Sequence, residues 1–169
     1  IDTSTHSIIN IEAIQHVEWL DQRRLDIENG KHWPTYRKFC SSKLSKNIIQ
    51  ELDKSTDSIL GRIEDPLRKG IWSSRGLVIG DVQSGKTTNF LGVITKALDA
   101  GYKIIVVLSG LHNNLRVQTQ ERFEEGVTGI NTKNDAINKL CGVAKFTDKP
   151  EELRIEGLTT RNGTGDFTK

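Results

Sequence analysis

The chain has 169 residues and a formal net charge of +2, with 35% hydrophobic and 27% charged residues. This length allows one domain with a real core, or one domain with a helical appendage. The near-neutral balance gives no general signal for nucleic acid, and no apolar run is long enough to cross a membrane, so we expect a cytoplasmic protein. Two cysteines without metal-binding spacing, Cys40 and Cys141, predict free thiols in a reducing compartment.

Helical periodicity dominates the first 70 residues. Apolar residues recur at mostly helical spacing between Ile11 and Glu28. A short helix is expected to start near Pro34, because proline suits the first turn of a helix. A longer helix is expected from Lys46 to Ile63, although the weak helix formers 55–58 leave two shorter helices as an alternative.

The stretch from Arg75 to Thr88 organises the rest of the chain. Residues Gly80 to Thr87 fit G-x-x-x-x-G-K-[ST], the phosphate-binding loop of nucleoside triphosphatases. The apolar run 77–79 before the loop predicts a buried parallel strand. Apolar residues at helical spacing predict a helix from Thr87 to Leu98, ended by Gly101. Strand, loop and helix in this order favour a nucleotide site over a simple glycine turn.

Each residue type in the loop has a physical role at a triphosphate. Gly80 and Gly85 let backbone N–H groups approach the phosphate oxygens, and the N-terminus of the following helix adds partial positive charge. Lys86 can reach the β and γ oxygens, and we expect it to act as the catalytic cation. The Thr87 hydroxyl is the expected ligand of Mg²⁺. The residues expected to bind ATP are Gly80, Gln83, Ser84, Gly85, Lys86, Thr87 and Thr88.

A second continuous apolar run, from Lys103 to Gly110, predicts another buried strand. Strand, helix and strand over so short a stretch predict a right-handed βαβ unit in a parallel sheet, with ligands at the carboxyl ends of the strands. The predicted fold class is therefore α/β, with a parallel sheet over residues 71–169 and a helical region over residues 1–70.

The segment after the second strand is expected to form another helix, ending near Gly126. Asn113 or Asn114 can cap this helix, and polar side chains gather near its N-terminus. That end suits a nucleic-acid phosphate held by backbone N–H groups and Arg116. It equally suits the hydrated side of an ordinary capped amphipathic helix, and the spacing favours neither interpretation.

The residues around the loop, taken as a set, resemble the Z1-domain proteins, which are labelled as endonucleases. The similarity is dense from Asp65 to Gln120 and sparse elsewhere. It implies an incomplete RecA-like P-loop ATPase lobe of the superfamily 2 helicase type, acting on DNA with other components of bacterial restriction-modification or phage-defence systems. It also places the segment 109–120 where such proteins contact the nucleic-acid backbone. The DNA-contacting residues that it implies are His112, Asn113, Arg116 and Gln120.

One departure from the family pattern concerns the acidic segment with which such ATPases hold Mg²⁺ and position water. No apolar strand followed by an acidic pair comes after the loop, and the second lobe with its arginine finger is absent. We therefore expect an N-terminal portion of a longer protein, which binds ATP without hydrolysing it efficiently. The lack of any methionine also suggests that the chain is part of a longer product.

Two other classes of function stay open. A P-loop kinase or ligase acting on a small molecule would need an arginine-rich lid, and the lack of an arginine cluster after residue 122 disfavours it. A non-enzymatic nucleotide-binding scaffold would use the basic stretch 31–75 to bind a partner, although a hydrated helical surface explains that stretch at least as well.

Overall fold

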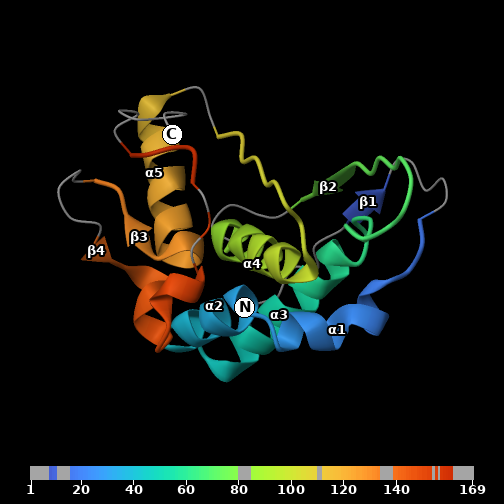
Figure 1. Cartoon of the computed structure of the whole chain (residues 1–169), viewed down its shortest axis with the longest axis horizontal. Helices are drawn as coiled ribbons and strands as arrows, with labels where there is room; N and C mark the ends of the chain where they lie inside the picture. Colours follow the sequence, from blue (N-terminus) through green and yellow to red (C-terminus); the bar gives the residue numbers. More distant parts are fainter. Residues whose placement is uncertain are drawn as a thin grey trace.

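The computed structural model describes residues 8–10, 16–79, 85–109, 112–133, 139–153, 155 and 157–161 (Figure 1). Its α-helices are α1 (Leu20–Glu28), α2 (His32–Ser41), α3 (Lys46–Leu60), α4 (Lys86–Ala100) and α5 (Asn113–Phe123). A π-helical turn η1 (Glu124–Thr128) and two 3-10 turns, η2 (Gly142–Phe146) and η3 (Pro150–Leu153), follow α5. The strands are β1 (Ile8–Asn10), β2 (Gly76–Val78), β3 (Ile130–Asn131) and β4 (Lys139–Leu140).

The predicted α/β fold with a parallel sheet is wrong, because the described part of the chain is mostly helical. Its strands form only two antiparallel pairs, β1 with β2 and β3 with β4. The run before the loop does contain a strand, but β2 pairs with β1, with Ile8 opposite Val78. The expected second strand is not formed: residues 102–109 run from the end of α4 towards α5 without strand structure (Figure 1).

The predicted second strand fails because this segment is not buried as a strand of a parallel sheet must be. A parallel strand needs a neighbour for its backbone and helices over both of its faces. No strand pairs with residues 102–109 in the described structure, and only one side of the segment is covered: Ile105 packs against the core, whereas Ile104 and Val106 are 81% and 74% exposed. The helices that would cover a sheet pack against one another instead. High strand propensity therefore did not decide the conformation of this segment.

The core forms where α4 lies across α2 and α3 (Figure 1). Trp33 and Tyr36 of α2, Leu60 of α3 and Ala100 of α4 are almost completely inaccessible to solvent. Apolar residues from α1, η1, η2 and η3 belong to the same cluster. The helix predicted after the loop is confirmed, and it joins the apolar core of the preceding helical region.

Helix α3 is continuous through residues 55–58, so the alternative of two shorter helices is wrong. Thr56 is fully buried, and its hydroxyl donates to the backbone carbonyl of Leu52 at 2.7 Å. The hydroxyl is thereby satisfied within the helix. Its methyl group lies against Gly92 of α4, where an added Cβ would approach it to 2.8 Å. The polar interruption in the sequence is thus a close helix–helix contact.

Two charged residues of α4 fasten the neighbouring helices. The carboxylate of Asp99 accepts the backbone N–H groups of Lys31, His32 and Trp33 at 2.7–3.1 Å, which caps α2 from another helix. Lys96, which is 1% exposed, donates to the carboxylates of Asp53 at 2.5 Å and of Asp57 at 2.6 Å. Its ammonium group also lies 4.1 Å from the ring centroid of Trp33.

The two cysteines are free thiols, as predicted. Across the part of the chain that the structure describes, no helix has both the length and the apolar character needed to span a membrane.

Candidate nucleotide-binding site

Helix α4 begins inside the predicted phosphate-binding motif. Gly85 is its N-cap and has φ +76°, in the left-handed region that favours glycine. Its carbonyl accepts the backbone N–H of Asn89 at 3.0 Å, which closes the first helical turn. The side chains of Lys86 and Thr87 are exposed on that turn. Of the other expected ATP-binding residues, Gly80, Gln83 and Ser84 lie outside the described residues.

Neighbouring helices hold the first turn of α4 in place. The hydroxyl of Tyr36, on α2, donates to the backbone carbonyl of Thr88 at 2.9 Å. The side-chain amide of Asn89 donates to the hydroxyl of Ser55, on α3, at 2.6 Å. Burial strongly raises the pKa of the Tyr36 hydroxyl, so it stays protonated and keeps donating. Thr88 thus contributes its backbone carbonyl to this brace, and its contact with the nucleotide stays a prediction.

The electrostatics of this helix start suit an anion. The first four residues of α4 include Lys86 and no acidic residue. Backbone N–H groups at a helix N-terminus carry partial positive charge and lack intrahelical acceptors. A polyphosphate can accept these N–H groups and the ammonium group of Lys86 together. The local chemistry therefore matches the motif.

The described residues offer few ligands to Mg²⁺. The Thr87 hydroxyl is exposed at the start of α4, and no group of three or more His, Cys, Asp or Glu residues gathers in the described structure. Mg²⁺ commonly keeps several waters and binds through phosphate oxygens with only one or two protein ligands. A single hydroxyl at the predicted phosphate-binding motif fits that mode of binding.

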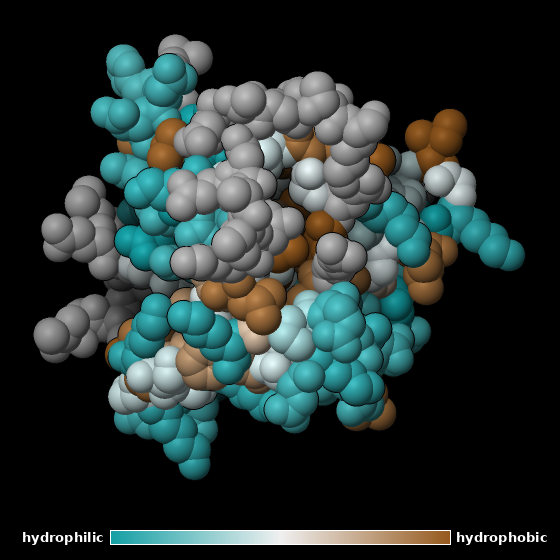
Figure 2. All heavy atoms as spheres, turned by 60° about the vertical axis from the view of Figure 1, so that its left-hand side comes forward, coloured by the Kyte–Doolittle hydropathy of each residue, from teal (hydrophilic) through white to brown (hydrophobic). Residues whose placement is uncertain are grey.

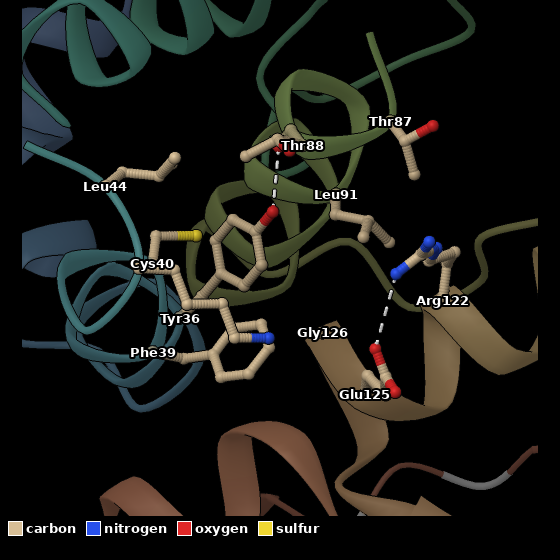
Figure 3. A pocket seen from close by; sticks show the side chains of 11 residues that line it. Tyr36, Phe39, Cys40, Leu44, Thr87, Thr88, Leu91, Arg122, Glu125 and Gly126 are labelled. Carbon is tan, nitrogen blue, oxygen red and sulfur yellow. Dashed lines mark hydrogen bonds and ion pairs between the residues drawn. The ribbon is translucent and has the colours of Figure 1, made fainter. Parts of the chain in front are cut away.

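A cavity of about 310 Å³ adjoins this helix start (Figure 3). It lies between α2, the first turns of α4, and the junction of α5 with η1. Its described lining consists of Tyr36, Phe39, Cys40, Lys43, Leu44, Thr87, Thr88, Leu91, Arg122, Glu125 and Gly126. Sequence reasoning missed this cavity, because its three walls come from segments far apart in the chain.

The four residues expected to contact DNA separate into two pairs. His112 and Asn113 are exposed at the start of α5. Arg116 and Gln120 instead point to the C-terminal segment: Arg116 donates to the backbone carbonyls of Thr160 and Arg161, both at 3.0 Å. Gln120 exchanges hydrogen bonds with Thr159 at 2.8 and 3.3 Å. The second pair fastens residues 159–161 to α5.

A buried ion pair lies beneath this fastening. Glu124, which is 1% exposed, accepts the Nε–H of Arg161 at 2.6 Å. It also accepts the hydroxyl and the backbone N–H of Thr132. Arg161 reaches Glu121 as well, at 2.9 Å. No local pattern in the sequence indicates this cluster, because its partners are distant in the chain.

Comparisons of the chain with protein-family models, with curated proteins and with solved structures found no match.

Proposed function

We propose that the N-terminus of α4 binds the phosphates of ATP together with Mg²⁺. One observation carries the proposal: the G-x-x-x-x-G-K-[ST] motif coincides with a helix start at which Gly85 is left-handed and Lys86 and Thr87 are exposed. Lys86 contacts the β and γ oxygens, and backbone N–H groups of the first turn donate to the same phosphates. Thr87 supplies one oxygen ligand to Mg²⁺, which neutralises phosphate charge when bound.

We infer the wider role from the resemblance of residues 65–120 to Z1-domain proteins. The bound ATP serves helicase-like DNA processing in a bacterial restriction-modification or phage-defence system, with other components of that system as partners. Both cysteines are free thiols, which agrees with a reducing compartment such as the cytoplasm.

Isothermal titration calorimetry with ATP and Mg²⁺ tests the nucleotide site. Lys86→Ala removes a charge-assisted contact and should weaken binding at least about tenfold. Thr87→Ala should reduce the gain in affinity that Mg²⁺ gives. Lys103→Ala is the matched control, because Lys103 is also exposed but lies beyond the opposite end of α4. Unchanged ATP affinity in Lys86→Ala would contradict the proposal.

DNA binding is tested at the exposed pair, His112 and Asn113. The double variant with both residues changed to alanine should weaken binding of single-stranded DNA at fixed salt, without lowering thermal stability. Arg116→Ala is a poor first choice, because its guanidinium group fastens the C-terminal segment. A further expectation is that DNA changes the affinity for ATP. Equal ATP affinity with and without DNA would argue against a DNA-coupled function.

A further inference from the structure

The lining of the cavity beside α4 has an apolar part and a polar part (Figure 3). Phe39, Tyr36, Leu44 and Leu91 give it aromatic and aliphatic walls. Arg122 and Glu125, at the junction of α5 and η1, supply a donor and an acceptor at its polar side. A planar ring with polar atoms at its edge matches this combination better than a purely apolar or purely ionic ligand.

The polar side of the cavity is available to a ligand. The distance from a guanidinium nitrogen (Nη1) of Arg122 to a carboxylate oxygen (Oε2) of Glu125 is 3.6 Å, and the two side chains are 65% and 36% exposed. An ion pair so long and so exposed contributes little to stability, so either group can turn to a ligand at small cost. The Lys43 ammonium lies 4.1 Å from the ring centroid of Phe39 and adds a second cation to the lining.

The position of the cavity connects it to the proposed phosphate site. Thr87 and Thr88 form part of its wall, and they belong to the same turn as Lys86. A ligand whose phosphates sit on the N-terminus of α4 therefore has this cavity directly beside it. The volume of about 310 Å³ lies at the lower end of the usual range for small-molecule sites, which suits one compact group rather than a whole nucleotide.

We propose that the cavity between α2, α4 and the α5–η1 junction receives the nucleoside end of the bound triphosphate. This inference rests on the proposed function, since it assumes phosphates at the N-terminus of α4. The base packs against the apolar wall that contains Phe39 and Leu91. Arg122 and Glu125 meet polar atoms of the base or ribose. The cavity thereby makes the site selective for a nucleotide over a bare polyphosphate.

Affinity for ATP and for inorganic tripolyphosphate, each with Mg²⁺, separates the two parts of the ligand. The wild-type chain should bind ATP at least tenfold more tightly than tripolyphosphate. Leu44→Trp places a bulky ring in the cavity and should remove most of that difference while leaving tripolyphosphate affinity unchanged. Leu67→Trp is the matched control, because Leu67 is exposed and does not line the cavity. Phe39→Leu gives a second cavity variant should Leu44→Trp not fold, as judged by circular dichroism.

Cys40 provides an independent reporter inside the cavity. In a Cys141→Ser background it is the only thiol of the chain. Burial raises the pKa of the Cys40 thiol, so alkylation is slow and is best followed at mildly alkaline pH. ATP should slow alkylation several-fold, and tripolyphosphate should leave the rate unchanged.

The outcomes distinguish the two proposals. Equal affinities for ATP and tripolyphosphate, with no protection of Cys40 by ATP, overturn the nucleoside cavity but leave the phosphate site intact. Loss of both affinities in Lys86→Ala supports the phosphate site on which the cavity rests. Tripolyphosphate affinity that is unaffected by Lys86→Ala overturns the proposed function, and the nucleoside cavity with it.

Discussion

Two apolar stretches that follow one another in the chain, α4 and residues 102–109, differ sharply in burial. Ile94 in α4 is 8% exposed, whereas Ile104 is 81% exposed. A helix satisfies its backbone internally and needs only one covered face, which α2 and α3 provide for α4. An extended segment needs a neighbouring strand as well as a cover. Apolar sequence alone therefore does not bury a segment.

The two stretches meet at an anchored point. Tyr102, just after α4, donates its hydroxyl to the backbone carbonyl of Glu64 at 2.5 Å, and its ring meets Trp72 edge to face. Beyond it the apolar side chains of Ile104, Val106 and Leu108 lie at the surface. On the face of the molecule that Figure 2 shows, apolar areas lie between hydrophilic ones. The packed helix α4 is thus followed directly by a segment whose apolar side chains are mostly exposed.

The largest expected effect comes from a matched pair of isoleucine substitutions, which tests the difference in burial between α4 and residues 102–109. Ile94→Ala should lower the free energy of unfolding by about 2–5 kcal/mol, because it leaves a cavity between α4 and its neighbours. Ile104→Ala should change it by less than about 0.5 kcal/mol, because that side chain already contacts water. Urea unfolding followed by circular dichroism measures both. Similar losses in the two variants would show that residues 102–109 are buried in solution.

A second test concerns the cap that α4 provides for α2. Asp99→Ala removes the acceptor of three backbone N–H groups and should lower the free energy of unfolding by about 2 kcal/mol. Asp148→Ala, at an exposed position, is the control and should have almost no effect. Equally small effects of both changes would show that the cap which Asp99 provides for α2 does not stabilise the protein.

The smallest expected effect is a pH dependence at the same junction. Burial lowers the pKa of His32 below its ordinary 6.5, although the nearby Asp99 carboxylate opposes this shift. Below pH 6.5 the unfolded chain therefore takes up a proton at His32 that the folded chain does not, so stability falls as the pH drops. The contribution of one such group is at most about 1.4 kcal/mol per pH unit.

His32→Gln should flatten the stability curve just below pH 6.5. Asp99 contributes with the opposite sign at lower pH, because burial raises the pKa of its carboxyl and the folded state then holds the extra proton. Chemical unfolding at closely spaced pH values measures the difference between the variant and the wild-type chain. An identical slope in both would contradict the assigned role of His32.

Sequence reasoning succeeded where the cause is local. The motif and the periodicity placed the start and end of α4 to within a few residues, because Gly85 and Gly101 both adopt the positive φ that only glycine tolerates easily. It failed for residues 102–109, where propensity suggested a buried strand. The contacts of Arg116 and Gln120 with residues 159–161 were also not predictable, because no pattern in the sequence around Arg116 and Gln120 indicates this distant partner.

The amino-acid sequence by itself determined a helix that begins at a glycine-bounded phosphate motif, with a lysine and a threonine on its first turn. Helix periodicity, glycine conformation and side-chain chemistry are all properties of neighbouring residues. Only the tertiary structure decided that α4 packs on helices rather than on a sheet, that Asp99 caps α2, and that a cavity lies beside the motif. Those features depend on which distant segments pack together. The free energy that favours this packing comes from the whole core and not from any single stretch of sequence.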